Sequence, residues 1–286
     1  MQATTLALVG ATGGAGTTRT AVELAAMGAR DGDDVAVVDA AFTTQGLSEY
    51  VAGRIDPDLT ALLTDGPDAA LSAAAYPVAG TRNAERSGSG GERRERGGIE
   101  SDDGNDPPDL PGRVDAVPAR APFERIARAK TAEAARKLER RIDEAATTYD
   151  AVVVDAAPVG SNEAVAAATS VDRAVAVRPA TAHGRDATQR LRGRIADVGG
   201  SLDATLAVER PGSRGSDAGV DGDETEDSDA GIVRVPATDP EVAAAPTAAA
   251  GDSAYARAIA SAYETAFDAS LGVEFSDPGV IERFTP

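Results

Sequence analysis

One glycine-rich stretch decides how this chain folds, and it reads Gly10-Ala11-Thr12-Gly13-Gly14-Ala15-Gly16-Thr17-Thr18-Arg19-Thr20. It follows the apolar run Leu6-Ala7-Leu8-Val9 and precedes a helical pattern over residues 17–30. A strand, a glycine loop and a helix in this order direct backbone N–H groups at an anion. Glycines also let the backbone turn tightly and approach a phosphate closely. The stretch therefore predicts a phosphate-binding loop, although it contains no lysine.

Strand and helix patterns alternate along the rest of the chain. Apolar runs predict strands at 4–10, 35–39, 114–118, 149–155, 173–179, 204–208 and 232–236. Helical spacing of apolar residues predicts helices at 17–30, 58–64, 67–75, 131–146, 161–169, 183–198 and 253–270. Continuous apolar strands suit a parallel sheet that is covered on both faces. The sequence therefore predicts an α/β fold, a doubly wound and mostly parallel sheet flanked by helices.

Two segments interrupt this alternation. Residues 80–112 are rich in Gly, Ser, Arg, Glu, Asp and Pro, and residues 211–230 are rich in Gly, Ser, Asp and Glu. Neither segment has enough apolar side chains to form a core, so we expect two disordered insertions, the second of them acidic. The remaining residues, 1–79 and 113–286, are expected to form a single domain.

The composition is acidic and poor in lysine. The formal net charge is −19, and the only lysines are Lys130 and Lys137. Such a chain suits the cytoplasm of a halophile, here expected to be an archaeon, where dense salt screens the repulsion between like charges. The same acidity argues against non-specific binding of nucleic acid, which needs clustered lysine and arginine.

The inventory of metal-binding side chains is small. The chain has no cysteine and a single histidine, His183. Disulfides, zinc–thiolate sites, cysteine-bound iron–sulfur clusters and multi-histidine metal sites are therefore excluded. No apolar run reaches the length of a membrane span and no signal peptide is visible, so we expect a cytoplasmic protein.

Several motifs together resemble one family. The segment Thr12–Thr18 resembles the deviant Walker A loop of the ParA/MinD ATPases, K-G-G-x-G-K-S/T, with both lysine positions replaced by threonine, Thr12 and Thr17. In the second half, Asp155-Ala156-Ala157-Pro158-Val159-Gly160 is similar to the strand-end aspartate and short Pro/Gly loop of that family. Residues 172–179 and 185–191 resemble the strand and helix that follow. The chain is identified as a degenerate member of this group of P-loop proteins.

This resemblance implies ATP and Mg²⁺ as ligands. It assigns nucleotide contacts to Gly13, Gly14, Ala15, Gly16, Thr17, Thr18, Arg19 and Arg210. It assigns metal contacts to Thr18, which matches the family's Mg²⁺-binding Ser/Thr, and to two strand-end carboxylates, Asp39 and Asp155. In such sites loop amides and a lysine neutralise the phosphates, and the hydroxyl helps to hold the metal.

The departures from the family pattern concern hydrolysis. Thr17 replaces the Walker lysine, and Thr12 replaces the lysine that reaches the partner's nucleotide across a dimer. Ala41 stands where the family has the aspartate that orients the attacking water. Electrostatic stabilisation dominates phosphoryl transfer, so these losses predict weak or lost ATP hydrolysis. No catalytic residue is assigned, and the resemblance implies a nucleotide-dependent switch or positioning factor that forms a homodimer and acts on an unidentified protein partner or cargo.

Two alternatives remain open. The first is a nucleotide-free scaffold, a pseudo-ATPase that keeps only the fold. The second is an NAD(P)-binding reductase, because Gly10-x-x-Gly13-x-x-Gly16 also resembles the glycine turn of short-chain dehydrogenases and their NmrA-like relatives. Asp39 would then accept a hydrogen bond from a ribose hydroxyl. The chain has no Tyr-x-x-x-Lys pair, and the order of the other motifs favours the ParA/MinD resemblance.

Overall fold

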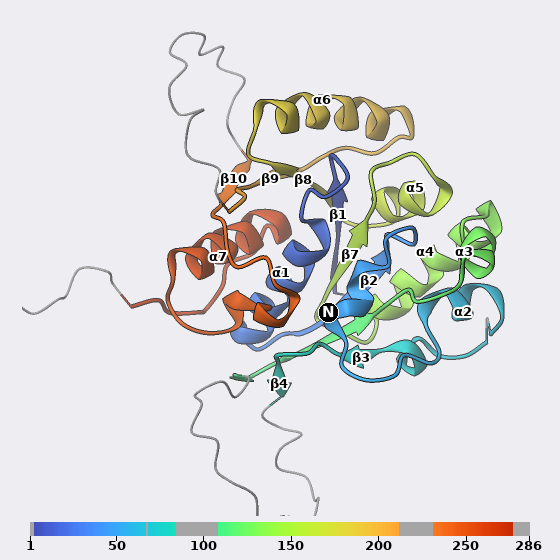
Figure 1. Cartoon of the computed structure of the whole chain (residues 1–286), viewed down its shortest axis with the longest axis horizontal. Helices are drawn as coiled ribbons and strands as arrows, with labels where there is room; N and C mark the ends of the chain where they lie inside the picture. The colour runs from blue at the N-terminus through green and yellow to red at the C-terminus, as the bar shows by residue number, and fades with distance from the viewer. Residues whose placement is uncertain (1–2, 67, 84–107, 212–230, 277–286) are drawn as a thin grey trace, which may run out of the picture.

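The structure, a computed structural model, describes residues 3–66, 68–83, 108–211 and 231–276. Within these ranges an eight-stranded sheet has the order β10-β9-β8-β1-β7-β2-β6-β3 (Figure 1). Its strands are β1 (Thr4–Gly10), β2 (Asp34–Ala40), β3 (Tyr76–Pro77), β6 (Arg113–Val117), β7 (Ala151–Ala156), β8 (Arg173–Pro179), β9 (Ala204–Val208) and β10 (Ile232–Val235). All neighbouring strands run parallel except β3, which pairs antiparallel with β6. The predicted fold class is confirmed.

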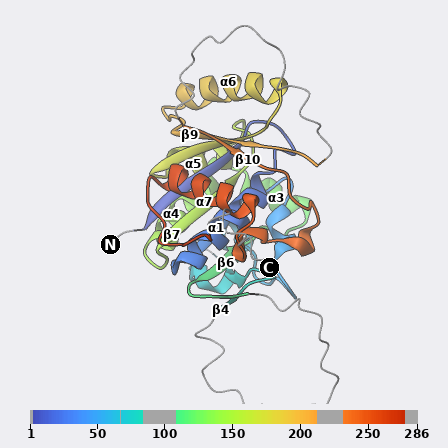
Figure 2. The same cartoon turned by 90° about the vertical axis from the view of Figure 1, so that its left-hand side faces the viewer.

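Helices cover both faces of the sheet (Figures 1 and 2). On one face lie α1 (Thr17–Asp31) and α7 (Ala254–Phe267). On the other lie α2 (Leu59–Thr64), α3 (Phe123–Ala129), α4 (Ala132–Ala146), α5 (Asn162–Thr169) and α6 (Ala182–Asp197). Short 3₁₀ turns connect these elements, η1 (Gly46–Tyr50), η2 (Leu71–Ala74), η3 (Val242–Ala244) and η4 (Thr247–Ala249).

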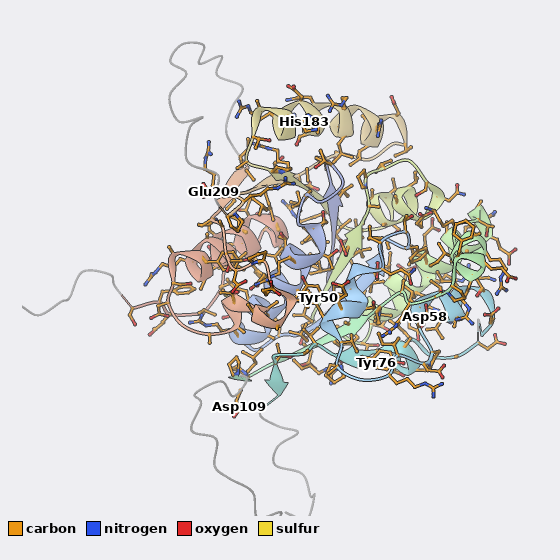
Figure 3. The ribbon with its side chains drawn as sticks, in the orientation of Figure 1. Tyr50, Asp58, Tyr76, Asp109, His183 and Glu209 are labelled. Atoms are coloured by element: carbon orange, nitrogen blue, oxygen red, sulfur yellow. The ribbon has the colours of Figure 1, made fainter. Side chains whose placement is uncertain are left out.

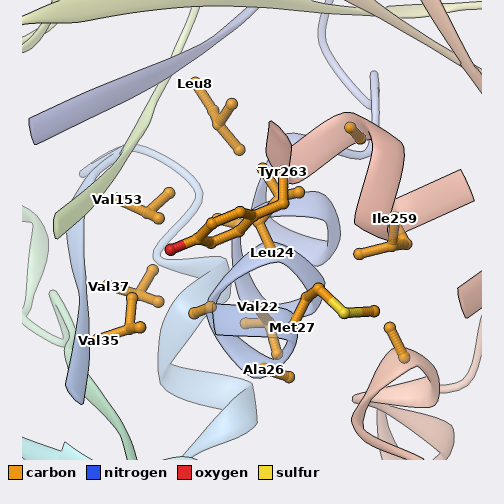
Figure 4. Close-up of a cluster of buried hydrophobic side chains, with 14 of the residues drawn as sticks. Leu8, Val22, Leu24, Ala26, Met27, Val35, Val37, Val153, Ile259 and Tyr263 are labelled. Carbon is orange, nitrogen blue, oxygen red and sulfur yellow. The ribbon is translucent and has the colours of Figure 1, made fainter. Parts of the chain in front are cut away.

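Side chains along the buried strands point alternately to the two faces of the sheet, so each strand contributes to two hydrophobic cores, one on each face. In β1, Leu6 and Leu8 face the core under α1 and α7, and Ala7 and Val9 face the opposite core. Figure 4 shows the first core, in which Tyr263 of α7 lies against α1. The hydroxyl of Tyr263 donates to Asp33 Oδ2 at 3.0 Å. Most of the other buried side chains are Ala, Val, Leu and Ile, because only 3% of the residues are aromatic.

The strand order bears on the dinucleotide alternative. In the dinucleotide-binding order, the first two strands of the fold are neighbours. Here β7 lies between β1 and β2, so Asp39 at the end of β2 pairs in register with Asp155 and not with a residue of β1. The carboxylate is thus one strand further from the glycine loop than the reductase interpretation needs. This order gives that interpretation no support.

Short elements differ from the sequence predictions. The predicted helix at 67–75 is wrong over its described part, where the structure has only the turn η2. Helix α3 and strand β3 were not predicted, because seven and two residues are too few to show a periodic pattern. Helix α3 begins after Pro122, whose fixed backbone angle suits a helix start.

The predicted insertions lie mostly outside the described residues. For the segment 80–112 these are residues 84–107, and for the segment 211–230 they are residues 212–230, so both predictions of disorder stay predictions. The two ends of the first segment are described, and they pair as parallel strands β4 (Arg82–Asn83) and β5 (Asp109–Leu110). Leu110 is buried in the core under α1. Among the helices of the described ranges, none has both the length and the apolar composition needed to span a bilayer.

Candidate functional site

The glycine loop connects β1 to α1 at the carboxyl edge of the sheet. Gly14 and Gly16 have φ angles of 68° and 89°, in the left-handed region that side chains disfavour. Gly16 is also the N-cap of α1 and therefore offers no side-chain oxygen to the first turn. The first backbone bond of the helix runs from the N–H of Thr20 to the carbonyl of Gly16 at 2.9 Å. The N–H groups of the preceding turn are consequently not used by the helix.

A cavity of about 320 Å³ lies in front of this helix end. Its walls come from three segments of the chain: Thr12–Arg19, then Ala41, Thr44, Gly46, Glu49 and Tyr50, and finally Asp155–Pro158. Parallel strands place these segments together, because β1, β2 and β7 all end at the same edge. The volume lies at the lower end of the range for small-molecule pockets.

Thr18 and Asp155 meet on the floor of this cavity. The Thr18 hydroxyl donates to Asp155 Oδ2 at 2.6 Å, and Asp155 is 1% exposed. The other carboxylate oxygen, Oδ1, is buried and has no hydrogen-bond partner among the residues that the structure describes. A buried charged oxygen without a partner is costly, and oxygen ligands are what Mg²⁺ prefers. The donor set fits a hydrated divalent cation held between these two side chains.

Asp39 lies behind this pair and does not line the cavity. Its Oδ1 accepts from the N–H of Ala41 at 2.9 Å, and its Oδ2 accepts from the N–H of Ala119 at 3.2 Å. Burial raises the pKa of Asp39, and the neighbouring charge of Asp155 raises it further. Burial also raises the pKa of Asp155, against the lowering effect of the Thr18 hydrogen bond. Asp39 as a metal ligand stays a prediction, and the described residues contain no cluster of three or more His, Cys, Asp or Glu that could hold a metal.

Arg19 is held by other parts of the protein. Its Nε donates to Glu23 at 2.6 Å, and its Nη2 donates to Thr247 Oγ1 at 2.8 Å. Its Nη1 donates to the carbonyls of Asp239 and Glu241, each at 3.2 Å. The side chain runs along α1 and reaches Glu23 one turn further on. Its donors are therefore directed at protein acceptors, although Arg19 also lines the cavity, and its contact with a nucleotide stays a prediction.

Arg210 reaches the loop from the end of β9. Its Nη2 donates to the carbonyl of Gly14 at 3.0 Å. The structure thus brings Arg210 to the predicted nucleotide-binding segment, as a support for the loop backbone. Glu209 beside it is exposed, and His183 lies on helix α6 (Figure 3) and is not among the residues that line the cavity.

The two threonines at the lysine positions leave the cavity without an ammonium group. Thr12 and Thr17 both line it. Among the described side chains that line it, Arg19 is the only basic one, whereas Glu49 and Asp155 are acidic. The described part of the site therefore offers backbone N–H groups and one hydroxyl–carboxylate pair, and its one cationic side chain is already bonded to protein acceptors.

Sequence reasoning missed the wall that follows β2. Only Ala41 matches a position of the family pattern, that of the water-orienting aspartate, whereas Thr44, Gly46, Glu49 and Tyr50 carry no motif, so their residue types do not indicate a site. Only their position could have indicated them, because residues that follow any strand of a parallel sheet lie at the same edge as the glycine loop.

Comparisons with known proteins place this geometry in context. No protein-family model matches the sequence, and no curated protein matches it either. Solved structures do match. A protein described as a plasmid partition protein from Borrelia burgdorferi B31, bound to AMPPNP, is 12% identical with a TM-score of 0.61, over 93% of this chain and 98% of that chain. The septum site-determining protein MinD of Pyrococcus horikoshii OT3, in complex with Mg-ADP, is 19% identical with a TM-score of 0.53, over 72% and 70% of the two chains.

The chain has the ParA/MinD ATPase fold. A third match of the same kind is cobyrinic acid a,c-diamide synthase from Mycobacterium smegmatis with a bound ATP analogue and magnesium, 15% identical with a TM-score of 0.52, over 72% of each chain. At these identities the likeness concerns the fold. Within its ParA/MinD fold, this chain keeps the loop glycines, Thr18 and Asp155, and it has threonine at both lysine positions.

Proposed function

We propose that this protein binds ATP together with Mg²⁺ at the glycine loop and acts as a nucleotide-dependent switch with weak or lost hydrolysis. The observation that carries the proposal is the helix end at Gly16, which has no side-chain cap and faces a cavity whose floor holds the unpaired Oδ1 of Asp155. Helix N-termini of this kind attract phosphate through their free N–H groups and the helix dipole.

The ligands of the similar structures support this choice of ligand. Those structures contain AMPPNP, Mg-ADP, and an ATP analogue with magnesium, respectively. In this chain the amides of Gly13 to Thr18 would receive the phosphates, and Thr18 and Asp155 would hold Mg²⁺. The cation, when bound, would neutralise part of the phosphate charge. Arg210 contributes by holding the Gly14 carbonyl, which keeps the loop backbone in place.

The expected activity is binding with little turnover. The cavity has no ammonium group, and Ala41 on its wall has no group that could orient a water molecule. Charge stabilisation by Lys, Arg and Mg²⁺ supplies most of the rate enhancement in phosphoryl transfer. A switch of this kind would respond to occupancy of the site more than to hydrolysis.

Assembly and setting belong to the same proposal. Gly13 and Gly14 at the tip of the loop are exposed, so a second copy could approach the loop directly. We expect an ATP-dependent homodimer that positions a protein partner or cargo in a salt-rich cytoplasm. Size-exclusion chromatography with light scattering, with and without Mg-ATP, tests the dimer.

Calorimetric titration tests the binding itself. The full chain is titrated in molar KCl with ATP, ADP, NADH and NADPH, each with and without Mg²⁺. The proposal expects saturable binding of ATP that strengthens with Mg²⁺, and loss of that strengthening in Thr18→Val. Thr169→Val, at an exposed position on α5, is the matched control. Binding of NADH or NADPH instead of ATP would refute the proposal.

A nucleotide-free scaffold is the second candidate. It is favoured by the missing ammonium groups and by the engagement of Arg19 with Glu23 and Thr247. It predicts no heat and no thermal shift with any of the four nucleotides. The same titration therefore separates the two candidates.

A further inference from the structure

The segment after β2 separates two cavities. Ala41, Thr44 and Gly46 line the first cavity, in front of the glycine loop. The residues between them, Phe42, Thr43 and Gln45, line a second cavity of about 400 Å³ that also borders α3. Residues 41–46 are therefore a wall shared by both cavities, and whatever fixes this wall also fixes one side of the candidate nucleotide site.

Lys130 holds the wall from the side of the second cavity. It is the C-cap residue of α3, and it lines the second cavity. Its ammonium donates to Thr43 Oγ1 at 2.9 Å and lies 3.0 Å from Glu163 Oε1. One ammonium group thus connects the wall to the first turn of α5.

A second bond ties the same residue to α5. The side-chain amide of Asn162 donates to the backbone carbonyl of Lys130 at 2.9 Å. Helix α5 begins four residues after the segment Asp155–Pro158, which also lines the first cavity and lies at the end of the strand next to β2. Lys130 therefore connects the wall at 41–46 to the helix that follows another lining segment of the candidate nucleotide site.

The environment of Glu163 makes this bridge specific for an ammonium group. Glu163 is 1% exposed, and its Oε2 has no hydrogen-bond partner among the described residues, so Lys130 supplies the ion pair of a buried carboxylate. The chain uses arginine almost everywhere, with only two lysines among 28 basic residues. An ammonium is a compact point donor that can serve two acceptors in different directions, whereas a guanidinium is a wide planar fork.

We infer that Lys130 is a positioning residue that couples the wall at 41–46 to α5 and so fixes the position of this wall of the candidate nucleotide site. The consequence for nucleotide binding rests on the proposed function, whereas the coupling itself is a property of the ligand-free chain. Loss of the bridge frees the wall to move, and binding of a nucleotide must then order it again.

The sharpest variant is Thr43→Val, which removes only the acceptor on the wall and leaves the pair of Lys130 with Glu163 in place. It is compared with Lys130→Met and with the double variant Thr43→Val/Lys130→Met. Lys137→Met is the control, because Lys137 pairs with the exposed Glu133 within α4 and does not line the second cavity. Hydrogen exchange of residues 41–46 and 156–162 is measured in the ligand-free full chain in molar KCl, and Mg-ATP binding is measured by calorimetry.

We expect Thr43→Val to speed exchange of the wall about tenfold and to weaken Mg-ATP binding by a similar factor, with an unchanged melting temperature. The double variant should exchange no faster at the wall than Lys130→Met alone, because both changes break one link. Lys137→Met should leave both measurements unchanged. Wild-type exchange at the wall in Thr43→Val, or additive effects in the double variant, would overturn the inference. If the wild-type chain binds no nucleotide, the proposed function fails, and the exchange data still decide the coupling.

Discussion

The hydroxyl of Thr18 donates to Asp155 Oδ2 at 2.6 Å, across 137 positions of sequence, and it leaves Oδ1 of the same carboxylate buried without a described partner. The bond joins the first turn of α1 to the end of β7. Two groups that the sequence connects only through a family resemblance are therefore in contact, and one acceptor between them is available.

Asp155→Asn tests whether this acceptor serves a cation. The amide keeps the shape of the side chain and removes its charge, so we expect ATP binding to lose its dependence on Mg²⁺. We also expect the free energy of unfolding to rise by about 1 kcal/mol without Mg²⁺, since a buried charge with an unfilled acceptor is removed. Titration with EDTA present or absent, together with urea unfolding, measures both. A variant that retains the wild-type response to Mg²⁺ would contradict the assignment of Asp155.

Thr17→Lys returns an ammonium group to the loop. The cavity lacks a lysine, so we expect ATP affinity to rise about tenfold or more, since a charge-assisted hydrogen bond contributes about 1.5–3 kcal/mol. The control is Gln189→Lys on the exposed face of α6, which adds the same charge far from the loop. Calorimetry with Mg-ATP measures the difference. An equal gain in both variants would mean that overall charge, and not the loop, governs binding.

The stability of the folded chain should depend on pH through Asp39. Burial and the charge of Asp155 raise the pKa of Asp39 to about 8, above its unfolded value of 3.8. Between these values the folded state holds a proton that the unfolded state has lost, so this contribution is fully present below pH 4 and is lost as pH rises through 8. The slope is at most about 1.4 kcal/mol per pH unit.

Asp39→Asn is the variant that isolates this effect. It should flatten the fall in unfolding free energy between pH 5 and pH 8 at constant KCl. Asp186→Asn, on the exposed surface of α6, is the control and should keep the wild-type profile. The explanation fails if wild type and Asp39→Asn show parallel profiles.

Arg19→Met should have a larger effect on the stability of the fold than on nucleotide binding. Glu23 is fully buried, and Arg19 is its ion-pair partner while also bonding the segment around Thr247. Removal of one partner of a buried pair costs about 3–5 kcal/mol. Arg54→Met, in an exposed pair with Asp56, should cost less than about 1 kcal/mol. Denaturant unfolding compares the two, and a small loss in both would show that the pair with Glu23 is not essential.

Gly28→Ala and Gly193→Ala form a matched pair inside helices. A Cβ at Gly28 would lie 3.0 Å from the ring of Tyr263 and from Val35, whereas a Cβ at Gly193 would meet nothing within 4 Å. We expect Gly28→Ala to cost about 1–3 kcal/mol through overpacking, and Gly193→Ala to stabilise by about 1 kcal/mol through helix propensity. Thermal unfolding shows whether each substitution raises or lowers the melting temperature. A higher melting temperature for both variants would mean that α7 moves away from the new methyl group at little cost.

Long apolar elements were predictable because their pattern is local. Residues 204–208 form β9 as predicted, and the run at 149–155 overlaps β7 at 151–156. The glycine loop was also predictable, because Gly14 and Gly16 adopt backbone angles that other residues avoid. Two strand-end carboxylates, Asp39 and Asp155, could be expected at one edge of the sheet.

The remaining features depend on contacts between distant segments. The strand order, in which β7 lies between β1 and β2, cannot be read from the sequence of any single strand. The same holds for the bond of Lys130 to Thr43, which links residues 87 positions apart, and for the carbonyl of Asp239 that accepts from Arg19. No periodicity encodes such pairs. Residue type alone therefore did not indicate that Arg19 bonds Glu23 and Thr247, or that Asp155 lines the cavity and Asp39 does not.

The pairing of β4 with β5 has a practical consequence. Asn83 and Leu110 are neighbours in that small ribbon, so the two ends of the described chain on either side of residues 84–107 lie at adjacent points. Because the cost of closing a loop grows only slowly with its length, we expect a fluorescent reporter or an affinity tag inserted between these two ends to be tolerated. The inserted reporter would lie at the amino edge of the sheet, opposite the carboxyl edge that carries the glycine loop.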